Sequence, residues 1–344
     1  MLGRLKELTE LNGVSGNEKA VRKYIRTHCE AIADEMRTDT MGNLIVHKKG
    51  DGRKIMICAH MDEVGMMVRA IKEDGLLAYS AAGIDPRVVC GKRVAIGPDK
   101  IDGVIGTKAI HLQSKSEFMA AYKHNQMYID IGAKDKADAE RSVKVGDYVA
   151  FTTKFEEFGE GLMKAKALDD RVGCCIVMDL LKNSYDCDLY AVFTVQEELG
   201  LRGATSAVYT VKPDLALILE GTTANDTAKT KGHQWVTRVG KGAALSFMDG
   251  GTITRPQMLD ELKACADDNG ISWQLRQGNR GGTDAGIIHK SVGGVVTGGI
   301  SLPCRYIHSP VSIASISDFE NCYKLADRFL AEKRFEKVLT ALGK

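Results

Sequence analysis

A predicted buried strand that is followed directly by a histidine is the feature that most constrains the fold of this chain. Residues 54–59 form a near-continuous apolar run, which is typical of a strand buried on both faces of a central sheet. His60 follows directly, just past the end expected for this strand. Because open α/β sheets bind their ligands at the carboxyl ends of strands, His60 indicates a functional site there.

Helical and extended patterns alternate before and after the middle of the chain. The expected strands are residues 43–47, 54–59, 188–195, 215–220, 271–276 and 294–300. The expected helices are residues 18–33, 171–183, 203–208, 256–268 and 317–342. This alternation predicts a sheet with helices on both faces, that is, a three-layer α/β/α domain.

The pattern changes in the middle of the chain, where glycines separate short β-prone runs. The expected strands there are residues 88–96, 100–105, 128–131 and 147–152. Several short strands with turn signals between them predict a small all-β unit. We therefore predict a catalytic domain made of residues 1–67 and 159–344, interrupted by a separate β domain of residues 68–158.

The composition argues against several classes of partner. A formal net charge of +2 over 344 residues, without a stripe of Lys and Arg, disfavours nucleic acid. No stretch approaches the roughly 20 apolar residues of a membrane span, and the first residues lack the apolar core of a signal peptide. The 9 cysteines show no Cys-x-x-Cys spacing, so no zinc knuckle is indicated. We expect a cytoplasmic protein without a nucleic-acid or membrane partner.

Residue types that bind metals recur where the predicted strands and helices begin or end. The set is His60, Asp62, Asp169, Asp170, Glu197, Glu198, Glu220 and His308. Taken singly, an aspartate before a helix is often an N-cap, and a charged residue at a strand end is often a surface group. Together, two imidazoles and several carboxylates form the ligand set that a pair of divalent cations needs. The set therefore predicts a two-metal hydrolase.

Position suggests roles within this set. Two cations about 3.5 to 4 Å apart need a carboxylate between them, and Asp169 is our candidate for that bridge. Of Glu197 and Glu198, one can bind metal while the other acts as general base, provided that the strand ends between them. Asp62 can accept a hydrogen bond from the imidazole nitrogen of His60 that does not bind metal.

Five segments resemble motifs of the tetrahedral (TET) aminopeptidases, a group that also holds glutamyl aminopeptidases and proteins once labelled cellulase M. These segments are His60–Gly65, Ala167–Gly173, Gln196–Ala204, Gly281–Ala285 and Arg305–Ser309. The likeness begins near Gly13 and reaches the C-terminal helix, so it covers nearly the whole chain. Five motifs in the same order and spacing make a chance agreement very improbable.

The resemblance implies a phosphorylase/hydrolase-like α/β domain interrupted by a β-barrel-like dimerisation domain. It also implies a homo-oligomer in which dimers assemble into a hollow tetrahedral dodecamer. Members of the family tend to have a cis peptide after the bridging aspartate, so we predict a cis bond between Asp169 and Asp170.

The resemblance also implies how the ligands are divided between two metal ions. His60 and Glu220 would hold one ion, Glu198 and His308 would hold the other, and Asp169 would bridge them. Glu197 would be the general base. Mixed imidazole and carboxylate ligands without thiolate suit Zn²⁺, Co²⁺ or Mn²⁺.

The predicted function is the removal of N-terminal residues from peptides that have a free N-terminus. Two enzymatic alternatives remain: another amidohydrolase on the same scaffold, such as a carboxypeptidase or deacylase, and a glycosidase. A protein that only stores metal is a third alternative. The preferred first residue stays open between acidic, basic and apolar, and so does the effect of Val311, where many relatives have an acidic residue.

Overall fold

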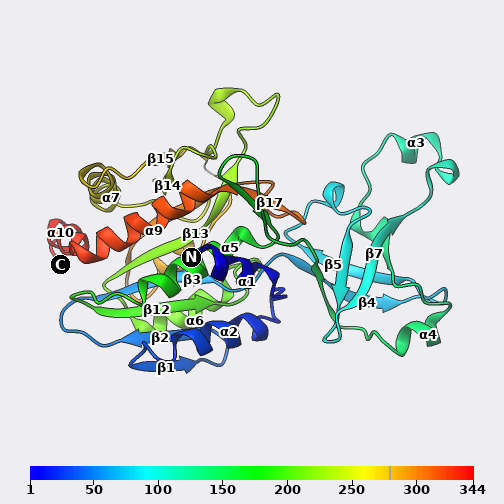
Figure 1. The fold of residues 1–344 in the computed structure, drawn as a ribbon, viewed down its shortest axis with the longest axis horizontal. Helices are drawn as coiled ribbons and strands as arrows, with labels where there is room; N and C mark the ends of the chain where they lie inside the picture. The colour runs from blue at the N-terminus through cyan, green and yellow to red at the C-terminus, as the bar shows by residue number, and fades with distance from the viewer. Residues whose placement is uncertain (279) are drawn as a thin grey trace.

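The computed structural model describes residues 1–278 and 280–344 and shows two units (Figure 1). The larger unit is an 11-stranded sheet with helices packed against it. The smaller unit is a closed barrel, which projects from one side of the larger unit and comes from the middle of the chain. This architecture confirms the predicted α/β fold with a small inserted barrel.

The large sheet contains strands from both sides of the insert. They are β1 (Glu35–Thr38), β2 (Leu44–Lys48), β3 (Lys54–His60), β10 (Glu156–Phe158), β11 (Leu162–Ala165), β12 (Asp188–Thr194), β13 (Leu215–Ala224), β14 (Ala243–Ser246), β15 (Trp273–Arg276), β16 (Val296–Arg305) and β17 (Ser312–Ser315). Their order is β1-β2-β12-β3-β13-β16-β17-β11-β10, and β14 pairs with both β15 and β16. At the centre, β12, β3, β13 and β16 run parallel to one another.

The central strands separate at their carboxyl ends. β12 stays paired with β3 as far as Thr194 and His60. In contrast, β13 pairs with β3 only over Leu215–Ile218, opposite Ile55–Cys58. Beyond these residues β3 and β13 no longer share hydrogen bonds, so the sheet opens where His60 and Glu220 lie.

Helices cover both faces of the large sheet. They are α1 (Leu2–Glu10), α2 (Lys19–Cys29), α5 (Leu168–Leu180), α6 (Arg202–Val211), α7 (Pro256–Asp268), α8 (Ala285–Ile288), α9 (Ile316–Ala331) and α10 (Arg334–Ala341). Ile55 and Ile57 of β3 belong to one apolar core with α1, α2, α5 and α9, whereas Met56 and Cys58 belong to a second core with α6 and α8. Because alternate strand residues point to opposite faces, these cores define three layers.

The barrel has an apolar core of its own. Its strands are β4 (Gly65–Ile71), β5 (Leu77–Ala82), β6 (Arg93–Ile96), β7 (Ile101–Thr107), β8 (Met127–Asp130) and β9 (Tyr148–Phe151), in the order β4-β5-β8-β7-β6-β9. The short helices α3 (Lys115–Phe118) and α4 (Lys136–Glu140) connect them. Val68, Leu77 and Ile129 are among the residues that fill the interior.

The insert differs in detail from its sequence pattern. The pattern does not predict β4, because an irregularity between Val68 and Ala70 breaks the alternation of apolar and polar residues. Residues 88–92, expected to be extended, precede the strand that begins at Arg93. Glu156–Phe158 pairs with β11 in the large sheet. The domain limits at 67/68 and 158/159 stay predictions.

Two elements of the larger unit also differ from expectation. β13 continues to Ala224, past its expected end at Glu220, because it pairs with β16 over its full length. The single C-terminal helix expected over residues 317–342 is the pair α9 and α10, because Lys333 between them has a left-handed φ of 52°. Among the described helices, none is long and apolar enough to cross a membrane.

Candidate metal centre

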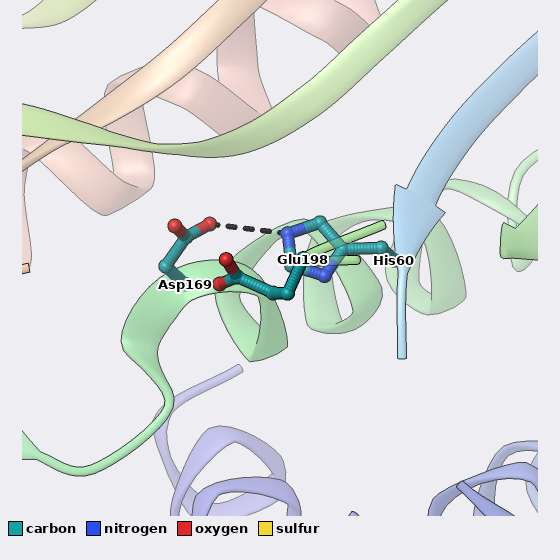
Figure 2. Close-up of side chains that lie close together, drawn as sticks. All are labelled: His60, Asp169 and Glu198. Carbon is teal, nitrogen blue, oxygen red and sulfur yellow. Dashed lines mark hydrogen bonds and ion pairs between the residues drawn. The ribbon is translucent and has the colours of Figure 1, made fainter. Parts of the chain in front are cut away.

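The predicted ligands converge at the opening between β3 and β13. His60, Asp169, Glu197, Glu220 and His308 line one end of a cavity of about 600 Å³. His60 is the last residue of β3, rather than the first residue beyond it. Figure 2 shows the side chains of His60 and Asp169 together with that of Glu198. One nitrogen or oxygen atom from each of these three lies within 4.8 Å of the others, so they could hold a metal ion.

Asp169 lies between the two histidines. Its Oδ1 is 3.3 Å from Nε2 of His60, and its Oδ2 is 3.6 Å from Nε2 of His308. Glu198 Oε2 is 3.4 Å from the same His308 nitrogen. The Asp169 carboxylate therefore presents one oxygen to each imidazole.

The start of α5 is tied to the end of β3. The Asp169–Asp170 peptide bond is cis, as predicted. The Asp170 side chain accepts hydrogen bonds from the backbone N–H of His60 at 3.0 Å and of Gly173 at 2.8 Å. Asp170 therefore places Asp169 and His60 relative to each other.

Glu220 reaches the centre from within β13. Its side chain is buried, and the Ser301 hydroxyl lies 3.4 Å from Oε1. Gly221 follows it, and a Cβ atom at that position would be only 3.0 Å from Cβ of Asp169. The glycine thus allows Asp169 to approach β13 closely.

Asp62 connects one histidine with the two glutamates. Its Oδ1 is 3.4 Å from Nδ1 of His60, and its backbone carbonyl oxygen is 3.2 Å from the same atom. The carboxylate also accepts hydrogen bonds from the backbone N–H groups of Glu197 at 3.0 Å and Glu198 at 3.1 Å. The Ser15 hydroxyl donates a further hydrogen bond at 2.6 Å. Asp62 therefore fixes the glutamate loop as well as facing the imidazole.

The chain turns before the glutamate pair, not between its members. β12 ends at Thr194, and Gln196 has a left-handed φ of 54°. Both glutamates consequently lie outside the strand, and strand alternation no longer sends them to opposite faces. This explains how two adjacent glutamates reach one site.

Burial changes the protonation of the carboxylates. Burial and neighbouring negative charges hold the pKa of Glu197 and of Glu220 well above the usual range. Burial raises the pKa of Glu198 to about 7. Carboxylates that are crowded in this way either bind protons or need cations beside them.

The pKa values of the two imidazoles are also raised, although burial acts on them in the opposite direction. Burial lowers the pKa of His60 and of His308, but their contacts with Asp169 and the other nearby acceptors together outweigh it, so the pKa of His308 rises to about 9 and that of His60 rises well above its usual value. Burial tends to raise the pKa of Asp169, yet its contacts with both histidines bring it below the usual value. A bound dication would take the place of the imidazole protons.

Thiols do not complete the centre. Burial raises the pKa of Cys58 and of Cys304 well above the usual thiol value, so both remain protonated. The donors that converge are imidazole nitrogens and carboxylate oxygens, which fit borderline divalent cations.

The structure gives supporting roles to residues for which the sequence analysis names none. Asp170, which the sequence analysis places in the predicted set without a role, and Ser15, which it does not place there, hold the site together through the contacts described above. Gly83 of the barrel contributes its backbone carbonyl oxygen, which lies 3.1 Å from Nδ1 of His308. Side-chain type cannot signal such a contact, because every residue carries that oxygen.

Known proteins share this architecture. The sequence profile of the M42 glutamyl aminopeptidase family matches residues 42–325, and a shorter profile named AMPT matches residues 5–23. A putative aminopeptidase of Acetivibrio thermocellus is 41% identical over 94% of this chain and 97% of its own length. A lysyl aminopeptidase of Pyrococcus furiosus is 31% identical over 95% of this chain and 96% of its own.

Solved structures agree with the sequence matches. A TET aminopeptidase from a marine sediment archaeon of the Thaumarchaeota superposes with a TM-score of 0.94 at 34% identity, covering 98% of this chain and 97% of its own. The TET1 peptidase of Pyrococcus horikoshii, described as able to assemble into a tetrahedron or a large octahedral shell, superposes with a TM-score of 0.85 at 29% identity, covering 96% and 99%. Relatives that are named aminopeptidases over nearly their whole length identify a peptide hydrolase.

Proposed function

Because the chain belongs to the M42 glutamyl aminopeptidase family, we propose that it removes N-terminal residues from peptides with two divalent metal ions at the centre described above. The observation that carries this proposal is the position of Asp169, whose two carboxylate oxygens face His60 and His308 respectively. A carboxylate placed between two imidazoles is suited to bridge two cations about 3.5 to 4 Å apart.

Each ion has its own ligands in this proposal. His60 and Glu220 would hold one ion, Glu198 and His308 would hold the other, and Asp169 would be shared between them. The contact between Glu198 and His308 and the shared cavity wall of His60 and Glu220 support this division. Zn²⁺, Co²⁺ or Mn²⁺ fits such nitrogen and oxygen donors.

Glu197 moves the proton during hydrolysis. When bound, the two cations supply Lewis acidity to the attacking water and to the peptide carbonyl. Glu197 lines the cavity but takes no part in the ligand contacts described above. As a carboxylate it can accept the proton of the attacking water and return it to the departing amine.

The acidic end of the cavity accounts for the need for a free N-terminus. Asp169, Glu197 and Glu220 all line that end, so a free α-amine would lie beside these carboxylates or coordinate a bound cation there. The names of the family and of the Pyrococcus furiosus relative, glutamyl and lysyl, differ in the residue removed. Family membership therefore does not fix the preferred first residue.

The substitution Glu197→Gln tests this mechanism. It should leave both metal ions bound, as measured by elemental analysis after dialysis, and reduce hydrolysis of an aminoacyl-nitroanilide by about 10²- to 10⁴-fold. Glu157→Gln, at an exposed position on β10, is the matched control and should keep the wild-type rate. A Glu197→Gln variant with near wild-type turnover would show that the base is misassigned.

An N-acetylated peptide provides a second test. The acetyl group removes the positive charge of the α-amine, so the acetylated form of a good substrate should resist hydrolysis. Equal cleavage of both forms would instead favour a deacylase or carboxypeptidase.

The barrel is proposed to form the dimer interface from which a tetrahedral dodecamer assembles in the cytoplasm. Large apolar side chains are exposed on the barrel, namely Val104, Ile110, Leu112, Phe118 and Met119. Exposed apolar groups concentrated on one unit are typical of protein interfaces. Light scattering should give a mass that is a multiple of the dimer, and a monomer at micromolar concentration would contradict this part of the proposal.

A further inference from the structure

Glu18 is a buried carboxylate just before α2. It is only 4% exposed, and its Oε1 accepts hydrogen bonds from the backbone N–H groups of Gly16 at 2.6 Å and Gln196 at 3.2 Å. Within the described residues, its side chain makes no capping hydrogen bond to α2. The contact with Gln196 joins segments 178 residues apart in the chain. The carboxylate therefore serves the turn before the two glutamates of the metal centre, rather than the helix that it precedes.

Four consecutive backbone N–H groups lead into and through this turn, and each is bound by a side chain from another segment. In chain order, the donors and acceptors are Val195 to Asn43 at 3.0 Å, Gln196 to Glu18 at 3.2 Å, Glu197 to Asp62 at 3.0 Å and Glu198 to Asp62 at 3.1 Å. Because β12 ends at Thr194, strand pairing no longer holds the backbone here. Side chains hold it instead.

Gln196 needs such support because of its backbone conformation. Its φ of 54° is left-handed, which costs roughly 1–2 kcal/mol for a residue with a Cβ atom. Glu18 binds the N–H on one side of the Gln196 Cα, and Asp62 binds the next N–H, which belongs to Glu197. Without the acceptor at Glu18, Gln196 can return toward an extended conformation and turn the following residues with it.

The two glutamates after the turn depend on it to different degrees. In the proposed centre Glu198 is a metal ligand, so a bound ion helps to hold its side chain. Glu197 is the proposed base and binds no ion, so its position follows from the backbone. A general base must lie within hydrogen-bond reach of the water that it deprotonates, and a displacement of about 1 Å can lower the rate by roughly 10²-fold.

We propose that Glu18 is a positioning residue, which holds the turn at Gln196 so that Glu197 faces the attacking water. This inference rests on the proposed aminopeptidase function. Glu18 is not among the described residues that line the cavity, so it acts through the turn and does not touch the substrate. Its contribution is an acceptor oxygen at the right distance, and its negative charge is not required.

Two substitutions separate the reach of this side chain from its charge. Glu18→Gln keeps the length and an acceptor oxygen but removes the charge. Glu18→Asp keeps the charge but is shorter by one carbon–carbon bond, about 1.5 Å. Since the oxygen of Glu18 lies 3.2 Å from the Gln196 nitrogen, this shortening takes it out of hydrogen-bond range.

Steady-state hydrolysis of an aminoacyl-nitroanilide by the metal-loaded enzyme measures the effect. Glu18→Asp should lower kcat by about tenfold or more and leave KM within about twofold of the wild-type value, because the base moves and the cavity does not. Glu18→Gln should keep nearly the wild-type kcat. Glu30→Asp, at an exposed position just after α2, is the control and should change neither constant.

Metal content shows whether the loss comes from the base or from the ligands. After dialysis, both Glu18 variants should retain as much metal as the wild type, because Asp62 still binds the N–H of Glu198. A loss of metal from Glu18→Asp that parallels its loss of kcat would overturn the assignment, since the ligands would then account for the effect.

Hydrogen–deuterium exchange tests the contact without relying on activity. In a peptide that covers residues 195–198, the amides of Glu18→Asp should exchange faster than those of the wild type, and those of Glu18→Gln should match the wild type. Unchanged exchange in Glu18→Asp, or an equal loss of kcat in both variants, would overturn the role of Glu18. If the wild type cleaves no aminoacyl substrate, the proposed function fails, and the exchange rates still show whether Glu18 holds the turn.

Discussion

The two histidines of the centre are held by different parts of the molecule. His60 ends the central strand β3, its side chain is 5% exposed, and Asp170 and Asp62 of the large unit fix it. His308 lies in a loop after β16 with a left-handed φ of 58°, its side chain is 42% exposed, and Nδ1 faces the carbonyl oxygen of Gly83 in the barrel. One half of the centre is therefore part of the core, and the other is assembled from a loop and the inserted unit.

This difference implies unequal robustness. A ligand in the core is coupled to folding, because its loss leaves buried carboxylates without a partner. A ligand in an exposed loop can be lost with little effect on the rest of the fold. We therefore expect the ion at His308 to exchange more readily than the ion at His60.

Replacing His60 or His308 tests the largest difference that we expect, which is in the free energy of unfolding. In the metal-free chain, His60→Ala should lower the free energy of unfolding by about 3 kcal/mol, because Asp169 and Asp62 lose a buried partner. His308→Ala should lower it by at most about 1 kcal/mol. Urea unfolding measures both variants, and equal losses would remove the contrast between the two halves.

The metal content of the two histidine variants provides a second comparison of the two halves of the centre. After dialysis, His308→Ala should retain one equivalent of metal, whereas His60→Ala should retain less because its fold is weakened as well. Retention of two equivalents by His308→Ala would show that this histidine is not a ligand.

The pH dependence of metal binding is the next largest effect. Below about pH 9 the metal-free His308 carries a proton, because its contacts with Asp169, Glu198 and the Gly83 carbonyl oxygen together outweigh the effect of burial on its pKa. A metal ion must displace that proton. The affinity of the His308 side of the centre for a metal ion should therefore rise by about tenfold per pH unit and level off near pH 9. Calorimetric titration with Zn²⁺ at pH 6, 7 and 8 measures this, and constant affinity would contradict it.

The same pKa has a consequence for folding. Since the folded pKa of His308 lies above its ordinary value of 6.5, the protonated imidazole stabilises the metal-free chain. This contribution is complete below pH 6.5 and is lost as the pH rises toward 9.

Replacing Gly83, the barrel residue that contacts His308, should have the smallest effect on stability and metal binding. Gly83 has a φ of +71°, and a Cβ there would be 3.2 Å from Val64 and 3.5 Å from Glu198 Oε2. Gly83→Ala should cost about 1 kcal/mol of stability and weaken the ion at His308. Gly91→Ala is a matched control, because Gly91 has a φ of +74° and nothing within 4 Å of its Cβ position. Equal metal affinity in both variants would exclude a role for Gly83.

The sequence predicts the core half of the centre better than the loop half. His60 follows an apolar run whose period and length indicate a buried strand, and Asp169 precedes an equally apolar helix. Each of these apolar runs lies next to its candidate ligand in the sequence. The strand or helix and the position of the ligand at its end can therefore be inferred from the same short segment. The extension of β13 beyond Glu220 is not local, because it depends on pairing with β16.

The loop half depends on contacts that side chains do not encode. The carbonyl oxygen of Gly83 and the backbone N–H groups that bind Asp62 belong to the main chain, which is the same for every residue type. The left-handed turn at Gln196, which frees the glutamate pair from the strand, occurs at a residue without a strong preference for that conformation. Only the folded chain places these groups.

The contact between Gly83 and His308 also limits how the enzyme can be simplified. A shortened protein in which the barrel is replaced by a brief linker would keep the central sheet and most of the catalytic side chains. It would lose the acceptor at Nδ1 of His308, so the imidazole would be free to rotate or to present the wrong tautomer. In the proposed mechanism the insert therefore contributes directly to the reaction centre, in addition to its proposed role in dimerisation.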